Sequence, residues 1–233
     1  MEKLRELSLF FPAYNEEANL EATVKKAVPV LKKIADKYEL IIVNDGSKDK
    51  TGDIARRLAQ KYPFIKTITH SSNLGYGPAL RSGFYNSKYA WITTVDADGQ
   101  FDFSEVSKLI EKTKKADVVI GYRLNRQDSR VRKFFGWGWT ILANLLLGIK
   151  VRDVDCSFKL VKKEVLEKIP KLESARGGMI SPELLGKARK AGFIIAEVGV
   201  HHYPRKRGRQ TGADLKVILR SFLDLGRLWW QIK

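Results

Sequence analysis

The chain has 233 residues, and its 43 basic and 26 acidic side chains give a formal net charge of +17. A hydrophobic content of 44% with 30% charged residues is typical of a globular protein and excludes a disordered one. The single cysteine, Cys156, excludes an intrachain disulfide and is compatible with a reducing cytosol. Residues Met1–Glu6 lack a signal-peptide core, and no apolar run reaches the ~20 residues that span a bilayer. The charge excess favours a polyanionic partner, which is nucleic acid, an anionic membrane or a phosphorylated substrate.

Short apolar segments alternate with amphipathic segments through the first half of the chain. The predicted strands are Leu7–Phe11, Leu40–Val43, Ile65–Thr69, Ala90–Val95 and Val118–Tyr122. The predicted helices are Glu16–Tyr38, Thr51–Lys61, Pro78–Ser87 and Phe103–Lys115, and Pro29 is expected to kink or split the first of them. This alternation predicts an α/β fold with a mostly parallel sheet and helices on both faces.

The pattern changes after about residue 125. A basic segment, Arg126–Lys133, precedes the apolar and aromatic segment Phe134–Leu147. Farther along, Asp153–Val161 and Ile194–His201 are predicted as strands and Pro182–Ala191 as a helix. Basic residues Arg205–Arg209 precede an amphipathic helix from about Asp214 to Trp230. Since no repeat or linker is present, we predict one domain over residues 1–210 and a C-terminal amphipathic helix over residues 211–233.

The most informative segment is Trp91–Gln100, where an apolar strand ends in two carboxylates followed by glycine and an amide. Side chains alternate along an extended chain, so Asp96 and Asp98 can point the same way. Two such carboxylates suit a divalent cation that keeps open positions for phosphate oxygens. A polar β-turn explains the same residues without a metal.

Polar clusters also follow the other predicted strands of the first half. They are Pro12–Glu16, Asn44–Ser47 and Asn73–Gly77. Helix caps and tight turns account for any one cluster alone. Ligands of open α/β sheets gather outside the carboxyl ends of the strands, so the clusters together indicate a binding site on one edge of the sheet.

These segments resemble the nucleotide-sugar site of the family 2 glycosyltransferases, whose fold is the Rossmann-like GT-A fold. The resemblance rests on Pro12–Glu16, Val43–Ser47 and Asp96–Gln100. In the second half, Gly121–Arg123, Asp153–Lys159 and Tyr203–Gly208 are similar to the branch that makes dolichyl-phosphate mannose or glucose. The chain departs from the usual family pattern at Asn44, Tyr76 and Gln210.

The resemblance implies a role for each residue of the donor site. Asp98, with Asp96 and Gln100, is expected to hold Mg²⁺ or Mn²⁺, which bridges the diphosphate and acts as a Lewis acid. Asp45 is expected to bind the base or ribose and Tyr14 to pack on the base. The residues expected to bind the nucleotide sugar are Pro12, Tyr14, Glu16, Asp45, Gly75, Asp96 and Asp98.

The acceptor implied by the resemblance is a polyprenyl or dolichyl phosphate. Arginines hold phosphate in a bidentate fork, and the candidates are Arg123, Arg132, Arg205 and Arg209. A phosphate acceptor is already ionised, so an in-line displacement with inversion needs positioning more than a base. A hydroxyl acceptor would need one, with Asp153, Asp155 and Glu183 as candidates. The expected catalytic residues are Asp98, Arg123, Asp153 and Arg205.

A lipid acceptor implies contact with a membrane surface. The segment Phe134–Leu147 and the C-terminal helix both combine apolar aromatics with basic residues, as interfacial helices do. We therefore expect a peripheral protein on the cytoplasmic face of a membrane. The same helices could instead pack on the core or on a membrane-anchoring partner subunit.

Three alternatives to this interpretation remain open. A family 2 enzyme can act on a glycan hydroxyl. The net charge of +17 also fits a nucleic-acid-binding module, although the common binding motifs are missing and no nucleic-acid partner is expected. A catalytically silent scaffold is disfavoured by the intact Asp96, Asp98 and Gln100.

Overall fold

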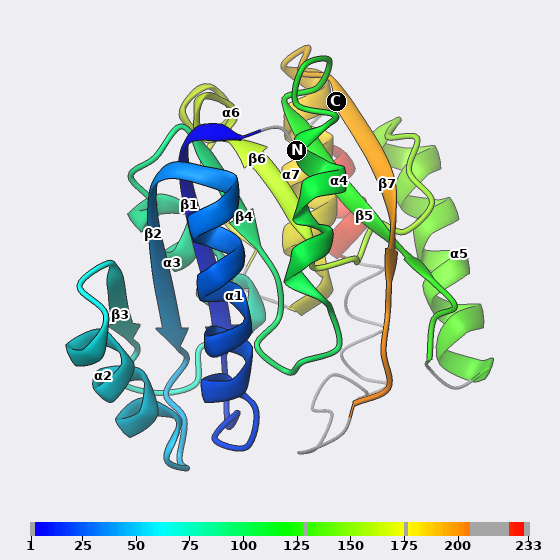
Figure 1. Cartoon of the computed structure of the whole chain (residues 1–233). Helices are drawn as coiled ribbons and strands as arrows, with labels where there is room; N and C mark the ends of the chain where they lie inside the picture. The colour runs from blue at the N-terminus through cyan, green and yellow to red at the C-terminus, as the bar shows by residue number, and fades with distance from the viewer. Residues whose placement is uncertain (1–2, 128–129, 175–176, 206–223, 231–233) are drawn as a thin grey trace.

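The computed structural model describes residues 3–127, 130–174, 177–205 and 224–230 (Figure 1). The strands are β1 (Leu4–Ala13), β2 (Ala35–Asn44), β3 (Ile65–Thr69), β4 (Trp91–Thr94), β5 (Val118–Leu124), β6 (Lys159–Lys162) and β7 (Ile195–His201). The helices are α1 (Leu20–Ile34), α2 (Thr51–Lys61), α3 (Tyr76–Asn86), α4 (Val106–Ile110), α5 (Arg130–Leu147), α6 (Lys163–Lys168) and α7 (Ile180–Lys190). Two 3₁₀ turns, η1 (Phe103–Glu105) and η2 (Gly177–Met179), precede α4 and α7, and residues 224–230 are also helical.

The strands form one seven-stranded sheet in the order β3-β2-β1-β4-β6-β5-β7. Pairing is parallel except at β6, which runs antiparallel to both β4 and β5. The predicted mostly parallel α/β fold is therefore confirmed. Because β6 alone is reversed, the carboxyl ends of the other six strands and the first residue of β6 meet on one edge of the sheet.

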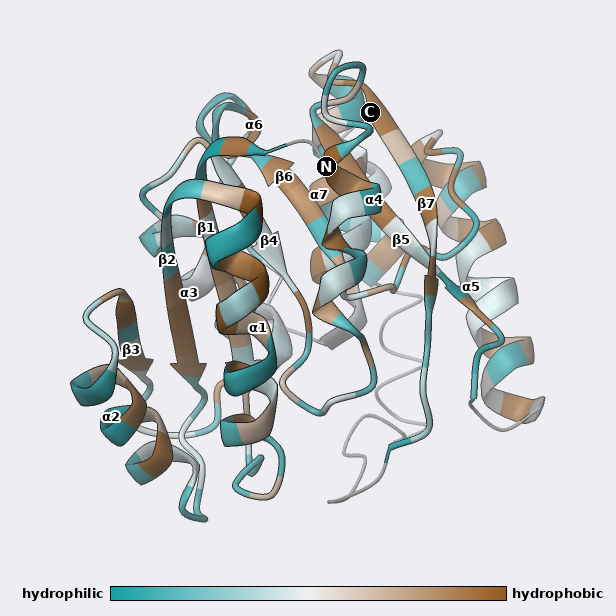
Figure 2. Cartoon of the chain, in the orientation of Figure 1, coloured by the Kyte–Doolittle hydropathy of each residue, from teal (hydrophilic) through white to brown (hydrophobic). Residues whose placement is uncertain are grey.

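The core follows from the apolar pattern of the strands and of α1. On β1, Leu7, Leu9, Phe10 and Phe11 are fully buried. Helix α1 buries one stripe, whose members include Leu20, Val24, Leu31 and Ile34, and its other face carries polar residues. Figure 2 shows the result: β2 is largely hydrophobic, whereas α1 alternates between hydrophobic and hydrophilic positions. The sheet is thereby held rigid beneath the loops at its carboxyl edge.

Several predicted boundaries were wrong. The first helix ends at Ile34 because residues 35–44 continue directly into β2, and Pro29 does not split it. The predicted helix Phe103–Lys115 is reduced to η1 and α4. Of the predicted strand Asp153–Val161, only its last residues belong to β6, and residues 153–158 form an irregular turn. The predicted domain boundary at residue 210 lies outside the described residues.

Helix α5 lies along one side of the molecule (Figure 1). One face of the helix is buried and the other is exposed. Its inner face buries Trp139, Ala143 and Leu147, and Asn144 exchanges hydrogen bonds of 2.7 and 3.1 Å with the backbone of Val151. Its outer face exposes Phe134 by 67%, Trp137 by 62% and Leu145 by 77%. Within the described residues, no helix is both long and apolar enough to cross a bilayer.

Candidate active site

The predicted site residues lie on the carboxyl edge of the sheet. Glu16 follows β1, Asp45 follows β2, the Asp96–Gln100 loop follows β4, and Arg123 lies near the end of β5. Arg205 follows β7, and Asp153 lies in the turn before β6. Strand order alone thus brings these distant segments of the chain to the same edge.

An ion-paired arginine connects three of these segments. Arg205 Nη2 donates to Glu16 Oε1 at 2.6 Å, and Arg205 Nη1 lies 3.6 Å from Asp98 Oδ2. The side chains of all three residues are nearly buried, so solvent screens these interactions little. The Arg205 guanidinium therefore holds the loop that carries Asp98 close to the loop that follows β1.

The paired carboxylates of the β4 loop interact with each other and with α3. Asp96 Oδ1 accepts a 2.9 Å hydrogen bond from the Tyr76 hydroxyl. Burial and the Asp96 charge raise the pKa of Tyr76 well above its usual range, so the phenol remains a donor. Burial and the neighbouring Asp96 carboxylate raise the pKa of Asp98 to about 7. The negative charges of two neighbouring carboxylates repel each other, and a bound cation would relieve that repulsion.

Gln100 anchors the other end of this loop. Its side-chain nitrogen donates to the Tyr203 carbonyl at 3.1 Å, and its own carbonyl accepts from the Tyr203 backbone at 2.8 Å. Its backbone nitrogen donates to Asp98 Oδ1 at 3.0 Å, which orients that carboxylate. Gln100 thus ties the carboxylate loop to the segment that carries Arg205, and its role as a metal ligand stays a prediction.

The donor set fits a cation that is shared with a substrate. Among the described residues, no group of three histidine, cysteine, aspartate or glutamate side chains gathers as a metal site held by protein alone would require. Asp96 and Asp98 offer two carboxylates. Mg²⁺ and Mn²⁺ take oxygen ligands and commonly leave positions for phosphate and water. These residues therefore suit a cation completed by a diphosphate.

Asp45 organises the neighbouring glycine loop. Its Oδ1 contacts His70 Nδ1 at 2.7 Å and accepts from the Leu74 backbone at 2.9 Å, while its Oδ2 accepts from the Gly75 backbone at 2.8 Å. Gly75 adopts a φ of 101°, a conformation that favours glycine. Both carboxylate oxygens already bind the chain itself, so Asp45 shapes the loop, and its predicted contact with base or ribose stays a prediction.

The remaining predicted donor residues occupy the same edge. Pro12 is buried near the end of β1, Tyr14 is partly exposed just beyond it, and Glu16 also accepts from Asn19 Nδ2 at 2.8 Å. Asn15 does not cap α1, because its side chain accepts from the Lys48 backbone at 2.9 Å. These contacts hold the loop after β1 against the loop after β2.

Near the end of β5, Arg123 forms a bidentate pair with Asp153. Arg123 Nε donates to Asp153 Oδ2 at 2.6 Å and Nη2 to Oδ1 at 2.8 Å. Although burial acts in the opposite direction, the hydrogen bonds and charge of Arg123 hold the pKa of Asp153 below its usual range. Asp153 is therefore a weak base.

The other two candidate bases differ sharply. Burial, followed by the charge of Asp153, raises the pKa of Asp155 to about 6. Glu183 is instead a structural clamp: it accepts from the backbones of Glu173 and Ser174 at 2.8 Å each and pairs with Lys187 at 2.6 Å. The hydrogen bonds hold the pKa of Glu183 below its usual range against the effect of burial. Of the predicted phosphate-binding arginines, Arg209 and the side chain of Arg132 lie outside the described residues.

Sequence reasoning missed three residues that contact this site. They are Tyr76 on Asp96, His70 on Asp45, and Lys159, which is 1% exposed at the start of β6. Tyr76 and Lys159 stand inside motifs of the sequence, but nothing in one sequence says which carboxylate a tyrosine or lysine will meet. His70 directly follows β3 at the carboxyl edge of the sheet. That position alone could have identified it as a residue of the site.

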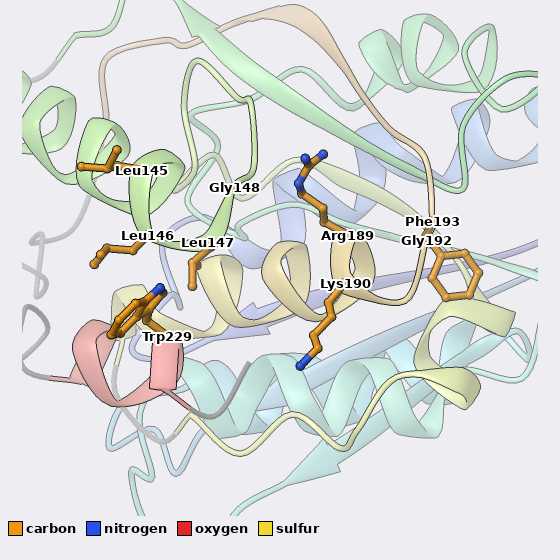
Figure 3. Close-up of a pocket in the computed structure, with 9 residues that line it drawn as sticks. All are labelled: Leu145, Leu146, Leu147, Gly148, Arg189, Lys190, Gly192, Phe193 and Trp229. Carbon is orange, nitrogen blue, oxygen red and sulfur yellow. The ribbon is translucent and has the colours of Figure 1, made fainter. Parts of the chain in front are cut away.

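The structure also contains a cavity of about 680 Å³ away from these residues (Figure 3). It lies where α5 and α7 end and where the helix of residues 224–230 packs. Its lining comprises Leu145, Leu146, Leu147, Gly148, Arg189, Lys190, Gly192, Phe193 and Trp229. None of the predicted site residues lines this cavity.

The sequence of this chain is similar to those of two enzymes named for lipid phosphates. A dolichyl-phosphate beta-glucosyltransferase of Trichomonas vaginalis is 34% identical over 83% of this chain, which spans 64% of that relative. A dodecaprenyl-phosphate galacturonate synthase of Rhizobium johnstonii is 27% identical over 94% of this chain, which spans 65% of that relative. This chain thus covers less than two thirds of each relative's own length.

A solved structure shares the fold at lower identity. Glucosyl-3-phosphoglycerate synthase of Mycobacterium tuberculosis, in complex with Mn²⁺, UDP and glucosyl-3-phosphoglycerate, aligns with a TM-score of 0.66 and 19% identity. The alignment covers 98% of this chain and 77% of that one. The profile of glycosyl transferase family 2 matches residues 8–170, which hold the sheet from β1 through β6 and its carboxylate loop. The chain therefore belongs to glycosyl transferase family 2.

Proposed function

We propose that this chain is a metal-dependent, inverting glycosyltransferase that moves a hexose from a nucleotide sugar to a polyprenyl phosphate at a membrane surface. The observation that carries the proposal is the shared edge on which Asp98, with Asp96 beside it, lies 3.6 Å from Arg205. Acidic residues there suit a metal-bound diphosphate, and arginines suit an anionic acceptor. The names of the Trichomonas and Rhizobium relatives support the same pairing of donor and lipid phosphate.

The donor half comprises the loops that follow β1, β2 and β4. Tyr14, which is partly exposed, would pack on the base, and Asp45 holds the Gly75 loop on the same edge. Asp96 and Asp98 would hold Mg²⁺ or Mn²⁺, with Gln100 oriented next to them. Such a cation supplies Lewis-acid neutralisation of the departing nucleoside diphosphate.

The acceptor half comprises Arg123 and Arg205. Both guanidinium groups are nearly buried and already oriented by carboxylates, which lowers the entropy lost when they bind phosphate. The acceptor phosphate is the nucleophile and attacks the anomeric carbon opposite the leaving diphosphate. Because the phosphate is already ionised, the arginines position it and no strong base is required.

A glycan hydroxyl is the second candidate acceptor. The observation that favours it is Asp155, whose pKa of about 6 is closer to that of a useful general base than an ordinary aspartate's is. Asp155 already accepts from Trp139 Nε1 at 3.1 Å, however, and the pKa of Asp153 lies below its usual range. A phosphate acceptor agrees better with both arrangements.

Membrane association is proposed from the outer face of α5. The exposed side chains Phe134, Trp137, Ile141 and Leu145 recur at helical spacing, and the inner face of the same helix packs on the core. Such a stripe fits the interfacial region of a bilayer, where a net charge of +17 attracts anionic lipids. Leu225 and Leu228 of the C-terminal helix are buried, so of its described part Trp230 is the apolar side chain left exposed. The cytoplasmic face and a membrane-anchoring subunit remain parts of the proposal.

A panel of donors tests the function. The purified chain is incubated with UDP-glucose, UDP-galactose, UDP-glucuronate, UDP-galacturonate or GDP-mannose, with dolichyl or undecaprenyl phosphate in micelles, and with or without Mn²⁺. We expect one donor to give a Mn²⁺-dependent glycolipid and free nucleoside diphosphate in equal amounts. Transfer to a glycan with none to either lipid phosphate would favour the second candidate.

A further inference from the structure

Lys159 is a lysine without access to solvent. It is 1% exposed and ranks among the largest fully buried side chains of the described residues. Lysine is almost never fully buried unless its charge has partners, because removing an ammonium group from water costs several kcal/mol. A fully buried lysine at the carboxyl edge of the sheet therefore requires an explanation from its surroundings.

The position of Lys159 is central to the candidate site. As the first residue of β6 it pairs with Thr94 on β4 and with Ile120 on β5. β4 leads within two residues to Asp96, and β5 leads within three residues to Arg123. Lys159 thus lies between the strand of the donor carboxylates and the strand of the acceptor arginine.

The contacts of Lys159 are with the turn that precedes it. Its Nζ donates to the Cys156 carbonyl, and its charge interacts with Asp155, Asp96 and Asp153. From the other side, Trp139 Nε1 on α5 donates to Asp155 Oδ1 at 3.1 Å. The turn of residues 153–156 is therefore held between β6 and α5, and the same turn presents Asp153 to Arg123.

Two further polar side chains are buried close to Lys159 in the sequence and the sheet. Within the described residues, Thr94 Oγ1 and Ser157 Oγ are buried without a hydrogen-bond partner. Thr94 is directly opposite Lys159, and Ser157 precedes it by two residues. Opposed residues of an antiparallel pair share one face of the sheet. An apolar residue at position 159 would be cheaper to bury there, so the ammonium group needs a positioning or electrostatic reason.

We propose that Lys159 is a positioning residue for the acceptor half of the site: it fixes the turn from which Asp153 orients Arg123. The proposal rests on the proposed function only in assigning Arg123 to the acceptor. Lys159 touches no reacting atom. It draws in the Cys156 carbonyl and balances the Asp155 carboxylate, so that the Asp153 side chain meets the Arg123 guanidinium in its bidentate arrangement.

The test compares Lys159→Met, which removes the charge at similar length, with Lys159→Arg, which keeps it. Lys162→Met is the matched control, since Lys162 lies on the same strand with its side chain 39% exposed. The first measurement needs no activity: hydrogen exchange of the Arg123 Nε–H is followed by ¹H–¹⁵N NMR in the full chain. We expect about tenfold or greater loss of protection in Lys159→Met, and wild-type protection in the control.

The second measurement is kinetic. For Lys159→Met we expect the kcat/KM for polyprenyl phosphate to fall about tenfold or more. The affinity for the Mn²⁺ complex of UDP or GDP, according to the active donor, should stay within about threefold of wild type. Lys159→Arg should recover part of the loss. Lys159→Gln, which removes the charge and shortens the side chain, replaces the methionine variant if the latter does not fold.

The outcomes separate this inference from the proposed function. Unchanged Arg123 protection in a folded Lys159→Met or Lys159→Gln protein overturns the positioning role, whatever the acceptor is. Equal losses in donor affinity and acceptor kinetics also overturn it, because they indicate a general structural role. If the wild type transfers to no polyprenyl phosphate while Arg123 protection still depends on Lys159, the proposed acceptor is wrong and the positioning role stands.

Discussion

Arg205 and Glu16 are joined by a 2.6 Å ion pair that spans 189 positions of the sequence. The guanidinium of Arg205 also lies 3.6 Å from Asp98, so a single side chain contacts the loop after β1 and the loop after β4. One nearly buried guanidinium between two carboxylates holds the loops after β1 and β4 together. In the proposed reaction the same guanidinium contacts phosphate.

Replacement of Arg205 by lysine should show whether this geometry matters. A lysine keeps the charge but has no planar fork, so it cannot meet Glu16 and Asp98 together. We expect Arg205→Lys to lower kcat/KM for the acceptor by about ten- to hundredfold. Arg56→Lys, at an exposed ion pair, is the control and should leave transfer unchanged. Steady-state kinetics measure both, and full activity in Arg205→Lys would refute the role.

The stability of the metal-free chain should depend on pH through Asp98. Its pKa is raised from 3.8 to about 7 in the folded state, so the folded chain holds a proton that the unfolded chain releases at lower pH. Stability therefore falls as the pH rises from about 4 to 7. Asp98→Asn carries no such charge and should be more stable than wild type by about 1 kcal/mol or more at pH 8. The difference in the free energy of unfolding between the two proteins should disappear near pH 4. Urea unfolding without metal measures it. A difference that grows toward low pH would contradict the raised pKa.

Loss of Asp153 should destabilise the fold through Arg123. The pair is bidentate and its two side chains are each 12% exposed, so removing the carboxylate leaves a nearly buried cation without its main partner. We expect Asp153→Asn to lower the free energy of unfolding by about 3 kcal/mol. Asp53→Asn breaks an exposed pair and should change it by less than about 0.5 kcal/mol. Equal effects in urea titrations would show that burial does not strengthen the Arg123 pair.

The outer face of α5 should determine binding to membranes. Alanine at Phe134, Trp137 and Leu145 removes three exposed apolar side chains without touching the inner face. We expect partitioning onto phosphatidylglycerol vesicles to fall about tenfold or more. Ile194→Ala, at an apolar side chain that is 58% exposed on another segment, is the control. Vesicle cosedimentation that is unchanged in the triple variant would place the membrane contact elsewhere.

The sequence located β1, β2, β3, β4, β5 and β7, most of them as short apolar runs, but it started β6 too early, because residues 153–158 form a turn. It also placed Glu16, Asp45 and Asp96 on one edge, since parallel strands impose that arrangement. It could not predict the reversal of β6, because a four-residue strand carries no signal of its direction. Nor could it pair Arg123 with Asp153 or Tyr76 with Asp96, because such contacts depend on the tertiary approach of separate strands and helices. Helix α1 was overextended because its polar and apolar pattern continues into the first residues of β2.

The central claim is that the Asp96 and Asp98 loop holds a metal-bound nucleoside diphosphate for transfer to a lipid phosphate. Its most direct test is glycolipid formation from the active nucleotide sugar and polyprenyl phosphate, measured for wild type and Asp98→Ala as Mn²⁺ is titrated. We predict that wild-type transfer rises with Mn²⁺ and disappears with a chelator, and that Asp98→Ala stays at least about a hundredfold lower at every Mn²⁺ concentration. Equal transfer by the two proteins, or transfer that persists in the chelator, would contradict the account.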